Sequence, residues 1–279
     1  MKLLTLNTHS LSPDFPDGER EFLDFLLSEQ PDGIALQEVN QTASERLWSG
    51  AIPMGYVASG GSVPIRRDNF AARLARGLSE KHIDYHWCWF PVKCGYSRFD
   101  EGLAIFTRAR PIRVRGDLLS GDRPYDDPRR RMALSVRLTD GTVICCTHTS
   151  RWDDPDEPFA PQWERLMRWL PRERGVFLMG DLNNPAERRG EGYDLILRSG
   201  FTDGYTASHV KRGRATVTGA LDGWRDGAGD ALRIDYIFLG QPMAVMEYRT
   251  VLDGVRSPRV SDHLGVMLTV APDRVGGGR

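Results

Sequence analysis

The chain has 279 residues, of which 40% are hydrophobic, so it is long enough to bury a large core in one or two domains. Its 37 basic and 38 acidic residues leave a formal net charge of -1, which excludes a global positive field that would attract nucleic acid or an anionic membrane. The sequence has no stretch that approaches the roughly 20 apolar residues of a membrane span.

The beginning of the chain and its cysteines bear on the cellular compartment. Residues 1–10, MKLLTLNTHS, contain one Lys and a short apolar run, so they lack the long apolar centre of a secretory signal. The four cysteines have no CxxC spacing of the kind found in zinc sites, and we expect four free thiols. We therefore expect a cytoplasmic protein with one domain over residues 1–275 and a disordered tail at residues 276–279.

The first part of the chain predicts two short strands and one helix. Residues 3–6 are typical of a buried strand, which ends at Asn7. Residues 17–29 have helical periodicity, with the apolar side chains on one face and Asp17 as the N-cap. Residues 34–36 are expected to form the next strand, and Gln37 and Glu38 follow it directly. A polar side chain therefore follows each of these two strands.

The rest of the chain is rich in strands, with one further convincing helix at residues 161–170. Cys145 and Cys146 are adjacent in one of the strands, so their side chains should point to opposite faces. The expected strands lie at residues 85–90, 103–107, 112–118, 132–138, 143–147, 176–179, 234–239, 243–252 and 264–270. Because helices are inserted among strands rather than alternating with them, the pattern favours an α/β sandwich of two sheets packed face to face, with helices outside, over a single doubly wound sheet.

Polar side chains recur where these strands begin or end. They are Asn7, Glu38, His148, Asp181 with Asn183, and Asp262 with His263. If they converge on one edge of a sheet, a cation and a phosphate group can both be held there. The oxygen ligands available from Asn7, Glu38, Asp181 and Asp262 favour Mg²⁺ or Mn²⁺ over zinc, and one metal ion is enough to explain them.

These residues belong to six ordered motifs that span residues 7 to 263. The motifs are Asn7, Gln37-Glu38, Thr147-His148, Gly180-Asp181-Leu182-Asn183, Arg233-Ile234-Asp235-Tyr236 and Ser261-Asp262-His263. In this order they resemble the endonuclease/exonuclease/phosphatase family. The resemblance implies the DNase I-like fold, a four-layered α/β sandwich with two mixed β-sheets, and a metal-dependent hydrolase of phosphate esters.

Longer stretches resemble one group within that family, the bacterial maltose 6'-phosphate phosphatases. The stretches are LNTHS (6–10), ALQEVNQ (35–41), YSRFDEGLAIF (96–106), HTSRWDDPDEPFAPQW (148–163), EGYDLILRSGFTDGY (191–205) and TVTGALDGWRD (216–226). The chain has Ser150-Arg151 where this resemblance leads us to expect Gly-Trp. The likeness implies a sugar phosphate as substrate, and this difference leaves the particular sugar open.

The resemblance also implies roles for individual residues. Glu38 would be a direct Mg²⁺ ligand, with Asn7 and Asp262 close to the metal or its waters. Asp181 would position or deprotonate the attacking water, and Asn183 would bind a phosphoryl oxygen. The remaining roles fall to a protonated His263 paired with Asp235, and to His148 as the second imidazole on the phosphate. Water would then attack phosphorus in line, without a covalent intermediate.

Each residue taken alone also has a plainer interpretation. An Asp or Asn after a strand is more often a turn residue than a site residue, although Asp235 inside an apolar run needs a partner if it is buried. Arg131 belongs either to a solvated strand edge or to a phosphate site. Trp152 packs in the core or stacks on a sugar ring, and Glu101 binds sugar hydroxyls or caps a turn.

Four functions remain open from the sequence. The first is a Mg²⁺-dependent phosphomonoesterase that acts on a small phosphorylated metabolite, in particular a sugar phosphate. The alternative of the same family is a metal-dependent nuclease or phosphodiesterase, which normally needs a basic groove for the nucleic-acid backbone. A phospholipid head-group hydrolase and a non-catalytic binding protein rank lower. We expect a small phosphorylated substrate as partner and neither nucleic acid nor membrane, and the oligomeric state stays open.

Overall fold

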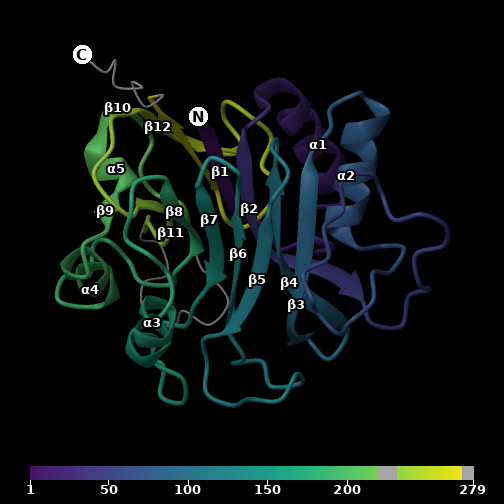
Figure 1. Ribbon diagram of the computed structural model, residues 1–279, viewed down its shortest axis with the longest axis horizontal. Coiled ribbons are helices and arrows are strands. Elements are labelled where there is room, and N and C mark those ends of the chain that lie inside the picture. The colour runs from purple at the N-terminus through teal and green to yellow at the C-terminus, as the bar shows by residue number, and fades with distance from the viewer. Residues whose placement is uncertain (219–230, 272–279) are drawn as a thin grey trace.

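The computed structural model describes residues 1–218 and 231–271, which form two β-sheets packed face to face with helices on both outer faces (Figure 1). Each sheet contains parallel and antiparallel pairs of strands. The predicted fold class, a four-layered α/β sandwich of two mixed sheets, is confirmed. Residues 276–279, predicted as a disordered tail, lie outside the described residues.

The larger sheet has seven strands in the order β10-β12-β13-β1-β2-β4-β3. The parallel pairs are β1 with β2 and β10 with β12, and the other neighbours run antiparallel. The strands are β1 (Lys2–Asn7), β2 (Gly33–Thr42), β3 (His86–Gly95), β4 (Phe99–Thr107), β10 (Ser208–Arg212), β12 (Val245–Val251) and β13 (Gly265–Val270).

The smaller sheet has six strands in the order β5-β6-β7-β8-β11-β9. Its one parallel pair among the described strands is β7 with β8. The strands are β5 (Arg113–Leu118), β6 (Met132–Arg137), β7 (Val143–His148), β8 (Val176–Asp181), β9 (Thr202–Asp203) and β11 (Asp235–Leu239).

The main core lies between the two sheets. Leu3 and Ile105 of the larger sheet pack with Phe177 of the smaller one, and all three side chains are fully or almost fully buried. Each such side chain contributes about 1.5–3 kcal/mol when it is removed from water. Cys146 points into this core, whereas Cys145 points into the apolar cluster on the other face of the smaller sheet, as the alternation along the strand predicted. All four cysteines are free thiols, which confirms that prediction.

The helices cover the outer face of each sheet. In Figure 1, α1 and α2 lie over the larger sheet, and α3 and α4 lie on the opposite side of the molecule, over the smaller sheet. None of the helices in the described ranges has both the length and the apolar composition needed to cross a membrane. The helices are α1 (Gly18–Glu29), α2 (Phe70–Glu80), α3 (Phe159–Met167), α4 (Gly192–Arg198) and α5 (Gly204–Ala207).

The helix α2 was not expected from the sequence, although its signals are present there. The side chain of Asn69 accepts a hydrogen bond from the backbone N–H of Ala72 at 3.0 Å and so caps the helix. Phe70, Leu74 and Leu78 recur every four residues and are all buried against the larger sheet. The short helix α4 and the short strands β9 and β10 were also not expected.

Two predicted helix ends differ from the structure. Asp17 occupies the N-cap position of α1, but its side chain makes no capping hydrogen bond and instead pairs with Arg20 at 3.2 Å. The helix predicted at residues 161–170 begins at Phe159 and ends at Met167. Its end is earlier because the backbone N–H groups of Arg168 and Trp169 bond three residues back, in a tighter turn than an α-helix.

Candidate active site

A cavity of about 530 Å³ opens where the ends of strands from both sheets meet. His148 and Asp181 are the last residues of the parallel strands β7 and β8, and they lie opposite each other in the strand register. Asp235 is the first residue of β11, which runs antiparallel to β8 and pairs with it so that Asp235 lies opposite Asp181. Strand pairing therefore brings residues that are far apart in sequence to one edge of the sheet.

A bulge in β2 places Glu38 at this edge. The register of β2 against β4 shifts between Leu36 and Val39, and Glu38 has a φ of 50°, in the left-handed region. The carbonyl oxygen of Glu38 accepts hydrogen bonds from the hydroxyls of Thr8 and Ser10, at 3.0 and 2.8 Å. These bonds hold the bulge, so the direction of the Glu38 side chain is set by the backbone.

Asn7 links two carboxylates of the cavity. Its side-chain N–H groups donate to Oε1 of Glu38 at 3.0 Å and to Oδ2 of Asp181 at 3.1 Å. Burial, followed by the nearby charge of Glu101, raises the pKa of Glu38. The amide of Asn7 offsets part of this cost because it donates to the charged form of both carboxylates.

His263 and Asp235 form a buried pair. The Nδ1 atom of His263 lies 3.0 Å from Oδ2 and 3.2 Å from Oδ1 of Asp235, which is completely buried. Burial lowers the pKa of His263, but the negative charges of Asp235 and Asp181 outweigh it and raise the pKa to about 10. His263 is therefore an imidazolium at neutral pH, with its Nε2–H on the side of Asp181 at 3.8 Å from Oδ2.

Asp181 has the opposite problem, because it is a buried acid beside another acid. Burial and the charge of Asp235 raise its pKa to about 7, although His263 and the hydrogen bond from Asn7 act in the other direction. Its Oδ1 accepts the backbone N–H of Asn183 at 3.0 Å. A carboxyl group with a pKa near 7 is suited to exchange a proton with a water molecule at neutral pH.

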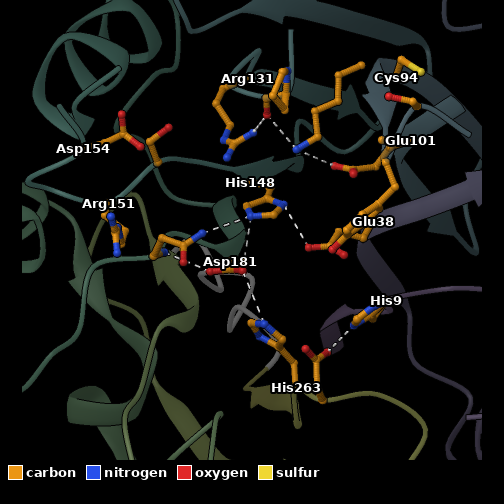
Figure 2. A pocket seen from close by; sticks show the side chains of 18 of the residues that line it. His9, Glu38, Cys94, Glu101, Arg131, His148, Arg151, Asp154, Asp181 and His263 are labelled. Carbon is orange, nitrogen blue, oxygen red and sulfur yellow. Dashed lines mark hydrogen bonds and ion pairs between the residues drawn. The ribbon is translucent and has the colours of Figure 1, made fainter. Parts of the chain in front are cut away.

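His148 is the neutral histidine of the cavity. Burial, together with the positive charges of Arg131 and Lys93, holds its pKa well below the usual value. The amide nitrogen of Asn183 lies 3.0 Å from Nε2 of His148, so the neutral ring accepts this bond and carries its proton on Nδ1. Figure 2 shows the ring of His148 between Arg131 on one side and Asp181 and His263 on the other.

The loop after β8 is held rigidly. Asn183 has a left-handed backbone, with a φ of 51°, and its amide also donates to the carbonyl oxygen of Thr149 at 3.0 Å. The hydroxyl of Tyr236 lies within hydrogen-bond distance of the carbonyl oxygens of Asn184 and Arg233, at 2.6 and 2.5 Å, and its one proton is shared between them. Arg233 itself forms a buried ion pair with Asp203 at 2.7 Å. Arg233, which belongs to one of the six sequence motifs, therefore supports the loop after β8 from behind the cavity.

The oxygen donors of the cavity fit a hard divalent cation. Glu38 and Asp262 line the cavity, and Asn7 lies directly behind Glu38. Burial raises the pKa of Asp262, but the hydrogen bond from His9 lowers it to about 2, so Asp262 is charged at neutral pH. Such an excess of carboxylates around one buried space is stabilised by a cation, and the donor set is the one that Mg²⁺ and Mn²⁺ prefer.

A second group of possible ligands lies deeper. Asp181, Asp235 and His263 each offer an atom within 4.8 Å of the others, and this is the one such group of His, Cys, Asp and Glu in the described part of the chain. However, Asp235 is hydrogen-bonded to Nδ1 of His263 and is not among the described residues that line the cavity, whereas Glu38 and Asp262 both line it. We therefore favour the end of the cavity at Glu38 and Asp262 as the cation site.

The structure brings most of the predicted residues together around this cavity. Glu101 and Arg131 lie along it, where Arg131 donates to the carbonyl oxygens of Pro128 and Arg130. Trp152 instead packs against the apolar cluster under α3, and it is not among the described residues that line the cavity. The predicted residues that line it are Glu38, Glu101, Arg131, His148, Asp181, Asn183, Asp262 and His263, with Asn7 and Asp235 hydrogen-bonded behind them.

Some lining residues were missed in the sequence. His9 pairs through Nδ1 with Oδ1 of Asp262 at 3.1 Å, and this hydrogen bond raises the pKa of His9. The buried Lys93 lies 3.2 Å from Oε1 of Glu101, and burial lowers its pKa. His9 follows Asn7 by two positions, and Lys93 is one of only four lysines in the chain. Both features are visible in the sequence, but neither shows which carboxylate the His9 or Lys93 side chain contacts.

The chain is similar to known proteins in sequence and in fold. A family model described as the endonuclease/exonuclease/phosphatase family matches residues 4–263. Among solved structures, a protein of that family from Leptotrichia buccalis is similar to the chain with a TM-score of 0.82 and 24% identity, over 98% of this chain and 100% of the other. No curated protein sequence matches.

Two further structures of similar fold have named activities. A mannosyl-6-phosphatase from Bacteroides thetaiotaomicron has a TM-score of 0.62 and 16% identity. The 3' phosphatase NExo from Neisseria, bound to a product DNA hairpin, has a TM-score of 0.58 and 20% identity. In both cases 98% of this chain and 100% of the other are covered. At these identities the likeness shows the fold alone.

Proposed function

Because this chain belongs to the endonuclease/exonuclease/phosphatase family and is therefore a metal-dependent hydrolase of phosphoester bonds, we propose that its substrates are small phosphomonoesters, in particular sugar phosphates. The observation that supports this substrate class is the set of acidic side chains that line the cavity. Three acidic side chains, Glu101, Asp126 and Asp154, line the cavity together with the catalytic groups. Carboxylates accept hydrogen bonds from sugar hydroxyls and repel a polyanionic backbone.

Asn7, Glu38 and Asp262 would hold the cation, which we propose to be Mg²⁺, with Mn²⁺ as a substitute. When bound, the ion supplies Lewis-acid neutralisation of charge on the phosphate. Asp262 is charged at neutral pH, and His9 keeps it oriented through the 3.1 Å contact. The bulge at residues 37 and 38 keeps Glu38 aimed at the same space.

The protein groups then orient and activate the reactants. Asp181 orients the attacking water and accepts its proton, for which a pKa near 7 is favourable. His263 is already protonated, so its Nε2–H stabilises charge on a phosphoryl oxygen without a proton transfer. The amide of Asn183 and the ring of His148, 3.0 Å apart, form the other side of the phosphate site. Positioning and electrostatic stabilisation carry most of the rate enhancement.

Arg131 and Glu101 are the proposed contacts on the substrate side. Arg131 makes hydrogen bonds through Nη1 to the carbonyl oxygens of Pro128 and Arg130, so its guanidinium is held in a fixed orientation along the cavity. Glu101 is held by Lys93 at 3.2 Å. We keep one catalytic domain, and a cytoplasmic location, as proposals, the latter supported by the four free thiols.

The alternative is a nuclease or another enzyme that acts on nucleic-acid ends. NExo, which was solved with a product DNA hairpin, favours this reading through its similar fold. Arg131, Arg151 and Lys93 also place positive charge along the cavity. Acidic residues line the same cavity, and the whole chain has a net charge of -1. Both observations argue against a groove that binds the backbone of a nucleic acid.

A panel of phosphate-release assays tests the proposal. The purified chain is incubated with hexose phosphates, nucleotides and plasmid DNA, each with Mg²⁺, with Mn²⁺ and with EDTA. We expect metal-dependent release of phosphate from hexose phosphates and little cleavage of DNA. Efficient cutting of DNA at nanomolar enzyme, with no release from any monoester, would replace the proposed function by the nuclease alternative.

A further inference from the structure

The turn between β3 and β4 has an unfavourable backbone for its residues. The backbone N–H of Arg98 donates to the carbonyl oxygen of Gly95 at 3.0 Å, and Tyr96 and Ser97 between them have φ values of 49° and 52°. Positive φ at both central positions is the pattern of a type I′ turn, in which Asn-Gly is strongly preferred. Tyr and Ser are strained in this conformation because their side chains crowd the backbone.

The side chain of Tyr96 lies at the cavity rather than in a core. The residue is 66% exposed and lines the catalytic cavity. The base of the turn, in contrast, is fixed: the backbone N–H of Cys94 donates to the carbonyl oxygen of Tyr125 at 2.7 Å, and that of Ala43 donates to Arg98 at 2.9 Å. A strained and exposed aromatic residue on a fixed support at a cavity suggests a functional contact.

The surroundings of Tyr96 point to a carbohydrate. Among the described residues that line the cavity, Tyr96 is the one Phe, Tyr or Trp, since Trp152 packs under α3. Carboxylates of Glu101, Asp126 and Asp154 line the same cavity. An aromatic face that covers the apolar face of a sugar ring, with carboxylates that accept its hydroxyl protons, is a chemically complete site for a pyranose.

We propose that Tyr96 is a specificity-determining residue that stacks on the sugar ring of a carbohydrate monophosphate while the phosphate lies at His148 and His263. This inference rests on the proposed function, and it names the part of the substrate that the catalytic groups do not touch. A nucleobase also stacks on an aromatic ring, so nucleotides are the competing ligand class in the test. The acidic neighbours favour the sugar because their carboxylates accept protons from the several hydroxyl groups of a pyranose.

The first test compares selectivity among variants. Tyr96→Asn, Tyr96→Phe and, as a matched control, Met54→Asn are assayed with Mg²⁺ on a hexose 6-phosphate and on methyl phosphate. Met54 is also 66% exposed and is not among the described residues of the cavity. The selectivity is the kcat/KM for the hexose 6-phosphate divided by that for methyl phosphate. We expect Tyr96→Asn to lower this ratio at least fivefold, Tyr96→Phe to lower it less than twofold, and Met54→Asn to leave it unchanged.

A second readout separates function from scaffold. Asn tolerates positive φ, so we expect Tyr96→Asn to raise Tm by about 2 °C while selectivity falls. A merely structural tyrosine would lose stability and selectivity together. A ratio that stays within twofold in Tyr96→Asn, an equal loss in Tyr96→Phe, or a larger effect on nucleotides than on hexose phosphates would overturn the proposal.

Binding without turnover keeps the inference distinct from the proposed function. Saturation-transfer NMR of a hexose 6-phosphate, recorded with the wild type and with Tyr96→Asn in EDTA, reports contact with the sugar ring directly. We expect the ring-proton signals to be strong in the wild type and at least fivefold weaker in the variant. If this holds but no monoester is hydrolysed, the proposed function fails and the sugar site stands. If hydrolysis occurs but both proteins give equal signals, the sugar site fails.

Discussion

The floor and the rim of the cavity are held in place by different interactions. The floor is formed by His148, Asp181 and His263. The rim is formed by the β3–β4 turn and by residues 119–131 and 150–158. The floor residues lie at strand ends or are tied to them, and the backbone register sets their positions. The rim has few regular strands and is held by turns and ion pairs. The positions of the floor residues therefore depend on strand pairing, and those of the rim residues depend on turns and side-chain contacts.

Ion pairs join the two loops of the rim. Arg123 contacts Glu157 at 2.7 Å and Asp127 at 2.9 Å, and Arg129 contacts Asp156 at 2.7 Å. Glu157 also accepts the backbone N–H of Gly121 at 3.0 Å. Single surface ion pairs contribute little, but a connected and partly buried network restricts how the two loops move relative to each other. Under the proposed function, the reaction chemistry lies in the floor and the contacts with the rest of the substrate lie in the rim, so the two can be tested separately.

The largest expected effect comes from the floor. In His263→Ala, the protonated donor and its contact with Asp235 are both lost, so we expect kcat for phosphate release to fall about 10³-fold. The matched control is His209→Ala, an exposed histidine of β10 that lies outside the cavity. Activity within tenfold of the wild type would show that the floor is not the catalytic element.

The cation site should respond next. Glu38→Gln removes one negative charge and keeps the size of the side chain, so we expect the Mg²⁺ concentration for half-maximal activity to rise about 10- to 100-fold. A metal titration of initial rates measures this change. Glu80→Gln, whose side chain is 68% exposed at the end of α2, serves as control and should not shift the titration. An unchanged Mg²⁺ requirement in Glu38→Gln would place the cation elsewhere.

The two floor histidines should titrate in opposite directions. In metal-free protein followed by side-chain NMR, we expect His263 to stay protonated until the pH approaches its pKa of about 10, and His148 to titrate below the ordinary histidine range. Because the pKa of His263 is raised from 6.5, its contribution to stability is fully present below pH 6.5 and is lost as the pH rises through 10. Asp235→Asn should move the His263 transition downwards. Two histidines that titrate together near pH 6.5 would contradict this description of the floor.

The smallest effect is expected at the rim. Glu157→Gln keeps the acceptor for Gly121 but weakens the ion pair with Arg123, so we expect KM to rise about threefold and kcat to change less than twofold. Steady-state kinetics on the best hexose phosphate measure both values. The control is Asp194→Asn in α4, which breaks the ion pair of Asp194 with Arg189, away from the rim. A loss of kcat that equals the change in KM would mean that floor and rim are not separable.

Local patterns in the sequence were sufficient to predict an α/β sandwich with two sheets and outer helices. Continuous apolar runs such as residues 176–179 identified buried strands, and polar residues after them identified where the site lies, because alternation and burial act over a few neighbouring residues. Helix α2 was not predicted, although the capping residue Asn69 and the four-residue spacing of Phe70 and Leu74 are present in the sequence. Boundaries shifted where tight turns replaced regular bonding, as at Met167.

The residue types of the site were also apparent from the sequence by itself. The order of motifs from Asn7 to His263 was enough to name a phosphoester hydrolase, and the carboxylates and imidazoles of these motifs lie in one cavity or directly behind it. It did not identify Tyr96, because an exposed tyrosine in a turn carries no signal until the sign of its φ and its place beside the cavity are known. Nor could it decide between core and cavity for Trp152.

Only the tertiary structure decided how these groups act on one another. The two histidines of the floor have the same chemistry, yet His263 is cationic beside Asp235 and His148 is neutral beside Arg131 and Lys93. The bulge that turns Glu38 towards Asn7 likewise depends on pairing with a strand more than 60 residues away. Residue types and strand ends are local properties of the chain, whereas charge state and direction depend on neighbours that strand register and packing bring from distant positions.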